Sequence, residues 1–313
     1  MIVKLKALGP IHIGSGEEIS PMDYYVNDKF TRINMNGLFN DPNFAPIMEK
    51  FIEAAGSQRY IGEHVPTKLL EEHPLYRLPI RGYAKEYLET NQTVIKAFIK
   101  SGARVYIPGS SLKGCILSAL LWYVLRNARH RDQQEIESLL NGSGKFNDLL
   151  NIGFKLMIHS RDDRSFRSMR FARWLDVGDS NFKDANQVLE ISLVRIQGAK
   201  TGQEQPILYE TLRTGVEFEL KISSQNLNFS ENQVLDICNQ FYRRVLKNEP
   251  SKNIQPTANL LRLGQGSSAF ATSLLILAED LNLSYYKVTP PTTRKRIDEH
   301  FAMGWVELSE CSN

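Results

Sequence analysis

The sequence predicts an α+β protein made of two ferredoxin-like (RRM-like) domains, with a partly helical insertion in the first domain. The predicted elements run strand–helix–strand–strand and then helix–strand, which is the order of a ferredoxin-like unit. The 313 residues allow two such units. A hydrophobic content of 42% with 23% charged residues is typical of a globular chain that can bury a full core.

The N-terminal part begins with a predicted strand at residues 2–8, where apolar and polar residues alternate. A Gly-rich turn follows at 9–16. Residues 30–105 mix Pro, Asn and short amphipathic pieces, so we expect an insertion with local helices there. The clearest helix starts at Ser110 or Ser111, either of which can cap it, and its apolar residues on nearly all sides predict burial.

The C-terminal part is richer in strand patterns. Three strands are predicted in succession, at residues 188–196, 207–213 and 216–222. Ser230 and Gln233 form a capping-box pattern before a second helix. The apolar face of that helix consists of Val234, Ile237, Cys238, Phe241 and Val245. A strand at 260–263, a Gly loop, a basic loop at 290–296 and a final strand at 304–310 complete the prediction.

We place the domain boundary after residue 225. Residues 1–225 then form an N-terminal domain that carries the insertion, and residues 226–313 form a C-terminal ferredoxin-like half with a Gly-rich loop.

Charge and cysteine usage exclude several classes of protein. Lys and Arg number 38 against 35 Asp and Glu, and a net charge of +3 excludes a histone-like polycation. Cys115, Cys238 and Cys311 are too dispersed for a disulfide framework or a CxxC zinc site. The longest apolar run is shorter than the ~20 residues that span a bilayer. We therefore expect a soluble, cytoplasmic protein without membrane contact.

Two Gly/Ser motifs resemble phosphate-binding loops, although neither has the GxxxxGK[ST] pattern of a nucleotide P-loop. Residues 9–16 read GPIHIGSG. Residues 108–114, PGSSLKG, place backbone N–H groups, two hydroxyls and Lys113 at a helix N-terminus, where the helix dipole favours an anion. An ordinary serine cap beside a surface lysine explains the second motif equally well.

A third Gly loop lies at residues 260–270, where Arg262 precedes Gly264 and Gly266. Glycines let another chain approach the backbone, and an arginine can hold a phosphate with two hydrogen bonds. A tight hairpin is the alternative. Three Gly/Ser loops in one chain favour a protein that binds a phosphate backbone.

The arginines cluster in residues 161–173, which contain five Arg and two Asp. Phe166 and Phe171 lie between arginines of this run, which include Arg167 and Arg170. Basic residues with interleaved aromatics suit single-stranded nucleic acid, which needs charge neutralisation and base stacking. A solvated charged face is the alternative, and a strand would send these arginines to opposite faces.

Patterns for catalysis are sparse. No histidine forms an HxH or HExxH pair, and no GxSxG elbow occurs, so we expect no resident metal or cofactor. Asp23, in SPMDYYVND at 20–28, is the one candidate catalytic residue. A lone Asp beside a nucleic-acid groove can orient a 2′-hydroxyl or a divalent metal, but it is more often a turn residue.

Several motifs together resemble the repeat-associated RNA-binding (RAMP) superfamily of CRISPR effector complexes. They are IHIGSGEE, YIPGSSLKGCILSALL, VGDS at 177–180, LRLGQGSS at 260–267 and the TTRKR…GWVEL tail. Within that superfamily the chain looks most like the capping backbone subunits of type III-A (Csm) complexes.

The resemblance implies binding to the 3′ side of the guide RNA (crRNA), contact with neighbouring backbone subunits, and a part in crRNA maturation and antiviral defence. Three groups of residues fall in the family's motifs, and we expect all three to bind RNA. His12, Gly14, Ser15 and Gly16 lie in its first Gly loop, and Arg262, Gly264 and Gly266 lie in its late Gly-rich loop. Ser110, Ser111 and Lys113 lie in its helix motif, which in this family faces guide RNA. Asp23 stands where repeated backbone subunits carry a target-cleaving aspartate, but capping subunits are regarded as non-cleaving.

Three hypotheses follow. The preferred one is a non-catalytic crRNA-binding subunit that also meets target RNA. The second is a metal-dependent endoribonuclease that cuts target RNA through Asp23. The third is a scaffold whose residues 30–105 and 126–150 recruit a neighbouring subunit or a host trimming nuclease.

Overall fold

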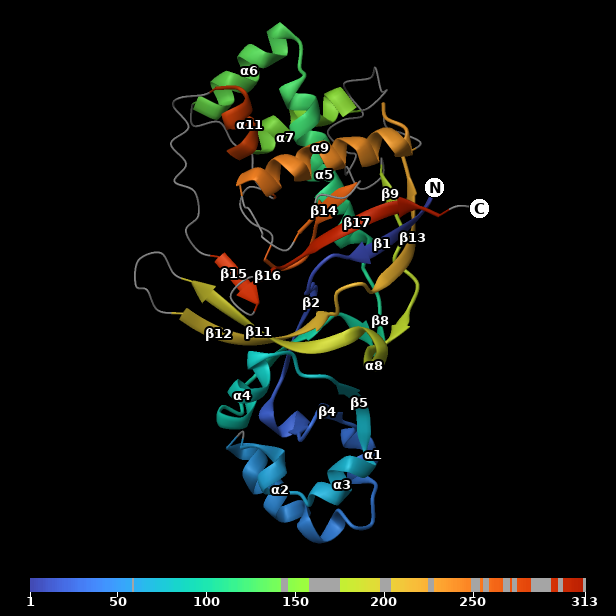
Figure 1. Cartoon of the computed structure of the whole chain (residues 1–313), viewed down its shortest axis with the longest axis vertical. Helices are drawn as coiled ribbons and strands as arrows, with labels where there is room; N and C mark the ends of the chain where they lie inside the picture. The colour runs from blue at the N-terminus through green and yellow to red at the C-terminus, as the bar shows by residue number, and fades with distance from the viewer. Residues whose placement is uncertain are drawn as a thin grey trace.

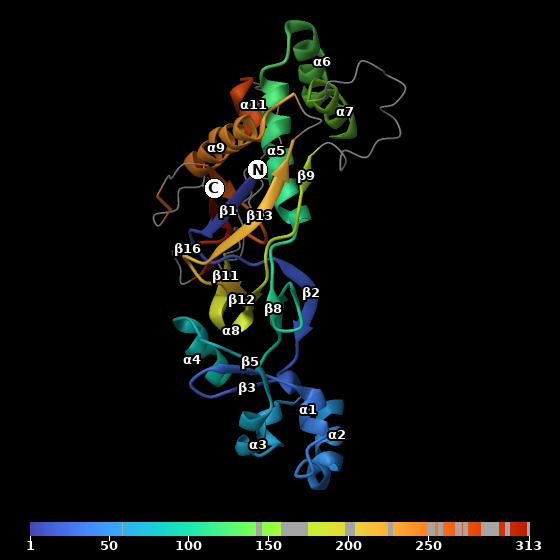
Figure 2. The same cartoon turned by 90° about the vertical axis from the view of Figure 1, so that its right-hand side faces the viewer.

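The protein is elongated, with an N-terminal insertion at one end and a layer of helices at the other (Figures 1 and 2). The computed structural model describes residues 1–57, 59–141, 146–157, 175–197, 204–224, 228–248, 254–255, 259–266, 271, 275–282, 294–297 and 301–311.

A five-stranded antiparallel sheet forms one half of the body. In spatial order its strands are β14 (Leu260–Arg262), β17 (Trp305–Glu310), β1 (Ile2–Ala7), β13 (Glu217–Ser223) and β9 (Asp176–Val177). Helices α5 (Gly109–Arg126) and α9 (Glu231–Asn248) pack against each other, α5 also against β9 and α9 against β14 (Figure 1). The strand order β17-β1-β13-β9, with α5 after β1 and α9 after β13, is that of a ferredoxin-like unit.

The sequence patterns explain these elements directly. The alternation predicted at residues 2–8 places Val3, Leu5 and Ala7 in the core, as expected. The predicted apolar face of α9 is buried at all five positions, and Ser230 and Gln233 form the predicted capping box. The C-terminal β17 pairs with the N-terminal β1, so strands from both sides of residue 225 share this sheet.

A second sheet has six strands and a different order. Its strands are β16 (Phe301–Ala302), β15 (Arg294–Ile297), β11 (Leu189–Gln197), β12 (Glu204–Leu212), β6 (Ile95–Phe98) and β2 (Gly14–Ile19). The predicted hairpin of the strands at 188–196 and 207–213 is confirmed by the antiparallel β11–β12 pair. Within the described residues one ferredoxin-like unit is therefore seen, and this sheet does not repeat its order.

Two local predictions are wrong because sheet pairing overrides local composition. The Gly-rich stretch expected as a turn at 9–16 enters β2 at Gly14, which pairs with Phe98 of β6. The basic segment 294–296, expected as a loop, lies in β15 and pairs with β11.

The insertion is a small subdomain with its own core. Strands β3 (Tyr24–Val26), β4 (Phe30–Ile33) and β5 (Pro74–Leu78) form its sheet, and α1 (Met35–Phe39), α2 (Met48–Gly56) and α3 (Thr67–Glu72) cover it. Its buried apolar cluster consists of Met22, Ile33, Leu38, Phe44, Phe51, Ala54, Ile61, Val65, Leu69 and Leu70. The insertion core thus lies within residues 22–70, whereas β6 at the end of the predicted range 30–105 belongs to the body.

The remaining described elements connect these parts. A three-stranded sheet contains β10 (Lys183–Asp184), β8 (Arg104–Val105) and β7 (Lys100–Ser101). The other helices are α4 (Tyr83–Thr90), α6 (His130–Asn141), α7 (Phe146–Met157), α8 (Ala185–Val188) and α11 (Leu275–Asp280), with 3-10 turns at Pro21–Asp23, Ala45–Ile47 and Ile61–Glu63. None of the helices within the described residues has the length and apolar character needed to cross a bilayer.

Candidate nucleic-acid interface

The first and third Gly loops, far apart in the sequence, meet in space. The Gln265 N–H donates to the carbonyl of His12 over 2.8 Å. Gly264 has φ of +76°, and a Cβ atom at this position would lie 2.4 Å from the same carbonyl oxygen. Only glycine combines this backbone conformation with so close an approach. The structure therefore joins two predicted motifs into one junction.

His12 anchors the junction to the six-stranded sheet. Its side chain is buried, and its Nδ1 lies 2.7 Å from the backbone oxygen of Glu210. A carbonyl only accepts, so Nδ1 carries the proton in this contact. The imidazole also packs edge-on against the rings of Phe98 and Tyr209. His12 thus holds the first loop to the six-stranded sheet, with its ring turned away from solvent.

Arg262 secures the third loop in the same way. The side chain is buried, its Nε donates to the Met303 carbonyl over 3.0 Å, and its Nη2 donates to the Gly266 carbonyl over 2.6 Å. The guanidinium also lies over the ring of Trp305. The sequence predicts a phosphate contact for Arg262. The observed geometry favours a positioning role, because these donors already bind one carbonyl of the loop and one just before β17.

Gly304, which the sequence analysis did not single out, completes the junction. Its N–H donates to the Pro10 carbonyl and its carbonyl accepts from Leu263 N–H. A Cβ at Gly304, where φ is +88°, would lie 2.4 Å from the Leu263 carbonyl oxygen. A glycine directly before the final strand was the available signal.

Gly14, Ser15 and Gly16 form the exposed side of the junction. They belong to β2, an edge strand of the described sheet, and a bulge between Gly14 and Glu18 interrupts pairing with β6. The Ser15 hydroxyl accepts from Glu17 N–H over 3.1 Å. An exposed backbone with little side-chain bulk is therefore supported by buried His12 and Arg262.

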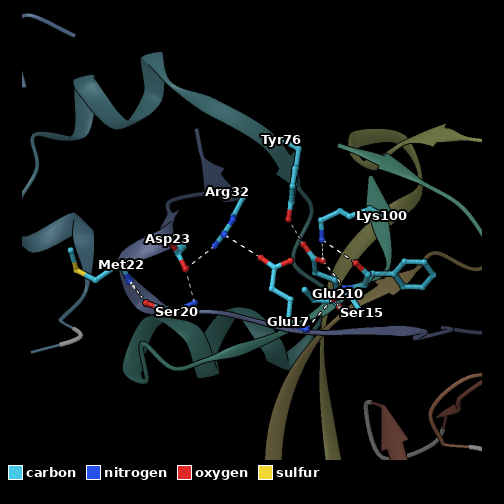
Figure 3. A network of polar contacts seen from close by, with 11 residues as sticks. Ser15, Glu17, Ser20, Met22, Asp23, Arg32, Tyr76, Lys100 and Glu210 are labelled. Atoms are coloured by element: carbon cyan, nitrogen blue, oxygen red, sulfur yellow. Dashed lines mark hydrogen bonds and ion pairs between the residues drawn. The ribbon is translucent and has the colours of Figure 1, made fainter. Parts of the chain in front are cut away.

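A buried polar network lies behind β2 (Figure 3). The Glu210 carboxylate accepts from the Tyr76 hydroxyl over 2.6 Å, from Phe98 N–H over 2.8 Å and from Lys100 Nζ over 2.5 Å. Burial, chiefly, and the neighbouring carboxylate raise the pKa of Tyr76, which stays protonated as the donor. Sequence reasoning missed this network. The available signal was Glu210, a carboxylate within the strand predicted at 207–213.

The start of α5 is capped from elsewhere in the chain. The helix begins at Gly109, and the Asp179 carboxylate accepts from Gly109 N–H over 2.7 Å. The predicted caps are wrong in this respect: Ser110 is exposed and Ser111 is half-buried, and no side-chain cap comes from α5 itself. Because an acceptor carboxylate already occupies the helix N-terminus, a bound anion there would have to lie to one side.

The VGDS motif, residues 177–180, packs closely against the start of α5. The Ser180 hydroxyl accepts from Ile107 N–H over 2.8 Å. A Cβ at Gly109 would lie 2.1 Å from the Val177 carbonyl oxygen.

Lys113 lies one turn further along α5 and is half-buried. Burial lowers the pKa of its ammonium group, and the Asp176 carboxylate opposes part of that shift.

Asp23 stabilises a turn of the backbone. It ends the 3-10 turn Pro21–Asp23, and its Oδ2 accepts from Ser20 N–H over 3.0 Å while Ser20 caps the same turn. Arg32 Nη1 lies 3.0 Å from the same oxygen, and Glu17 lies beyond Arg32 (Figure 3). Among the described residues Asp23 belongs to no group of three or more metal-ligating side chains.

Arg167 and Arg170, which were also predicted to contact RNA, lie outside the described residues.

Comparisons with known proteins place the chain among relatives. A model of the RAMP superfamily matches residues 4–270. The CRISPR system protein Csm5 of Methanocaldococcus jannaschii is 30% identical over 129 residues. That match covers 39% of this chain and 30% of the relative, so the chain spans about three tenths of the length of the curated relative that it matches.

Two solved structures share the fold. One is a chain of the cryo-EM structure of a Csm–crRNA–target RNA ternary complex of a type III-A CRISPR–Cas system, with a TM-score of 0.73 and 22% identity. That similarity covers 99% of this chain and 100% of the other. The second is the crystal structure of T. onnurineus Csm5, with a TM-score of 0.67 and 23% identity, covering 97% of this chain and 99% of the other.

Proposed function

This chain belongs to the RAMP superfamily, and from that membership we propose that it is a non-catalytic crRNA-binding subunit of a type III-A CRISPR interference complex. It caps the 3′ side of the crRNA and aids crRNA maturation and assembly of the complex. Its partners are crRNA, target RNA and neighbouring Csm backbone subunits, in a cytoplasmic setting.

The observation that carries the proposal is the junction of the two Gly loops. Buried His12 and Arg262 hold the junction from within, and Gly14–Gly16 remain exposed on an edge strand. A phosphate backbone can approach such a surface closely because two of its three residues are glycines and the third has only a small hydroxyl side chain. Support for the choice of complex comes from the named Csm5 relatives and from the Csm–crRNA–target RNA structure that shares the fold.

RNA contacts of this kind do not depend on base sequence, and Lys113 supplies the positive charge at the start of α5. His12, Arg262, Gly264 and Gly266 act as positioning residues that hold the exposed backbone in place. The proposal assigns no cleavage to Asp23, because its carboxylate caps a turn and pairs with Arg32.

The first test is purification of the tagged full chain from its native cell with sequencing of the bound RNA. We expect short RNAs that carry CRISPR spacer sequence, together with several related subunits. The complex is then reassembled with crRNAs that each carry a single 4-thiouridine, placed either near the 3′ end or in the 5′ handle. On irradiation, the chain should crosslink to the crRNA that is labelled near its 3′ end. Crosslinks confined to the 5′ handle would contradict the capping role.

The second test measures the contribution of Lys113 to RNA binding. Removal of one phosphate contact lowers the slope of log K against log salt by about 0.7–1, so we expect that decrease for Lys113→Ala. Lys50→Ala, which removes an exposed lysine from helix α2 of the insertion, is the matched control and should leave the slope unchanged. Equal slopes for wild type and Lys113→Ala would remove Lys113 from the interface.

A further inference from the structure

An exposed aromatic and arginine cluster lies on the small sheet of β7, β8 and β10. The side chain of Phe182 is 44% exposed, and its ring centroid lies 5.2 Å from that of Tyr106. The Arg104 guanidinium lies 5.0 Å from the centroid of the Phe182 ring. We call these three residues the Phe182 platform.

Strand register explains why the three side chains share one face. Lys183 pairs with Val105 and Asp184 with Arg104. The same antiparallel direction brings Phe182 and Tyr106, the next residue along each segment, side by side, as their ring contact shows. Arg104 and Tyr106 are two residues apart and point to the same side of β8. Val105, between them, points into the core.

The platform is held by backbone contacts that do not need its aromatic rings. Ser180 N–H donates to the Ile107 carbonyl over 3.0 Å, and the Asn181 side chain accepts from Glu219 N–H over 2.9 Å. The first bond joins the two segments of the platform, and the second ties the Phe182 segment to β13. The exposed face of Phe182 is available to a ligand rather than required for strand pairing.

Charge around the platform favours an anion with an aromatic part. Within the described part of the chain, the exposed Arg104 forms no ion pair with a carboxylate. Asp184, its cross-strand neighbour, uses Oδ1 to cap α8 by accepting from Asn186 N–H over 2.8 Å. An arginine over an exposed ring offers a stacking surface together with a phosphate donor.

The platform is also adjacent to the start of α5. Tyr106 precedes Gly109 by three residues and Phe182 follows Asp179 by three, and Gly109 and Asp179 are hydrogen-bonded to each other. Three extended residues span roughly 10 Å. That separation places the platform within one or two nucleotides of any strand that crosses the helix start.

We propose that the Phe182 platform is a nucleobase-stacking site for single-stranded RNA, in which one unpaired base stacks on Phe182 and Arg104 contacts the adjoining phosphate. This inference rests on the proposed RNA-binding function and adds a base contact to it.

The experiment uses the full chain and a fluorescein-labelled, unstructured 20-nucleotide RNA, with anisotropy measured at low salt. The two test variants are Phe182→Leu, which keeps apolar bulk, and Phe182→Trp, which keeps an aromatic face. Loss of one base–aromatic stack should weaken binding about tenfold in Phe182→Leu, whereas Phe182→Trp should bind as wild type does. The salt slope should stay unchanged in Phe182→Leu and fall by about 0.7 in Arg104→Gln.

The matched control is Phe39→Leu. Phe39 is also 44% exposed and packs against two aromatic rings, but it belongs to the insertion. We expect wild-type RNA affinity for this variant. An equal loss in Phe39→Leu and Phe182→Leu would overturn a specific platform.

The outcomes separate the two proposals. Failure of the wild-type chain to bind the RNA would overturn the proposed function and the platform together. Binding by wild type with equal affinity in Phe182→Leu would overturn the platform alone. Unchanged RNA affinity with lost subunit assembly would make the surface a protein contact instead and would also overturn the proposal.

A second measurement covers the case in which Phe182→Leu does not fold. Wild-type chain is irradiated with the same RNA containing 4-thiouridine, and crosslinked peptides are identified by mass spectrometry. Crosslinks within the peptides that hold Tyr106 or Phe182 are expected, and their absence while other peptides crosslink would overturn the platform.

Discussion

The third Gly loop and the start of α5 look alike in sequence but differ in what their residues do. In the loop, Gly264 adopts positive φ against His12, and Arg262 donates to the Gly266 carbonyl of the same loop. At the helix start, Asp179 caps the backbone from a distant segment, so Ser110 is left exposed. The third Gly loop therefore supports the fold from within, whereas the motif at the start of α5 presents side chains at the surface.

The difference teaches that glycine has two separate uses in this chain. Gly264 is required by backbone conformation and contact together. Gly109 is required by contact alone, because it lies in a helix against the Val177 carbonyl. At Gly114, also in α5, no described atom from outside the helix's own backbone lies within 4 Å of the Cβ position. The predictions below test this distinction, from the largest expected effect to the smallest.

Gly264→Ala should be the most damaging substitution. The added Cβ would lie 2.4 Å from the His12 carbonyl oxygen in a strained backbone conformation, and we expect a loss of about 3–5 kcal/mol in the free energy of unfolding. Urea denaturation measures this loss. Gly16→Ala, with φ of +85° and open space around it, is the control and should cost only about 1–2 kcal/mol. Equal costs would show that contact at Gly264 has no effect.

Arg262→Met should come next. It removes the donors to Met303 and Gly266 from a buried site, and we expect a loss of about 2–4 kcal/mol. Arg262→Lys keeps the charge but lacks the planar fork, so it should recover less than half of that loss. The salt slope of RNA binding, measured on the folded variant, should match that of wild type. A salt slope reduced by about one would show that Arg262 contacts a phosphate.

Asp179→Ala should have a smaller effect, because it removes one capping acceptor from α5. We expect a loss of about 1 kcal/mol, measured by urea denaturation. Asp179→Asn should keep most of the stability, since an amide oxygen also caps. Ser110→Ala is the matched comparison and should change stability by less than ~0.5 kcal/mol. A larger loss of stability for Ser110→Ala than for Asp179→Ala would indicate that Ser110, and not Asp179, caps the helix.

Gly114→Ala should have the smallest effect and the opposite sign. The position is exposed within α5 and open on all sides, so alanine should stabilise the helix by about 0.5–1 kcal/mol. The midpoint of urea denaturation should rise accordingly. Destabilisation of the isolated chain would reveal a close contact at Gly114 that the described structure does not contain.

Local patterns in the sequence were sufficient for the elements whose faces are set by periodicity. The alternation at residues 2–8 predicts β1, the apolar run after residue 109 predicts α5, and the spacing from Val234 to Val245 predicts α9. The motifs and their order also indicated the superfamily, whose model matches residues 4–270.

Tertiary structure alone decided how those motifs are used. Asp179 caps a helix that starts 70 residues earlier, Arg262 donates to Met303, and Glu210 accepts from three donors on two distant segments. No local pattern specifies such partners, because a buried polar group takes whichever donor or acceptor the packed chain brings within reach. The sequence therefore contained the elements and the family, while long-range contacts determined which Gly motif supports the fold and which faces solvent.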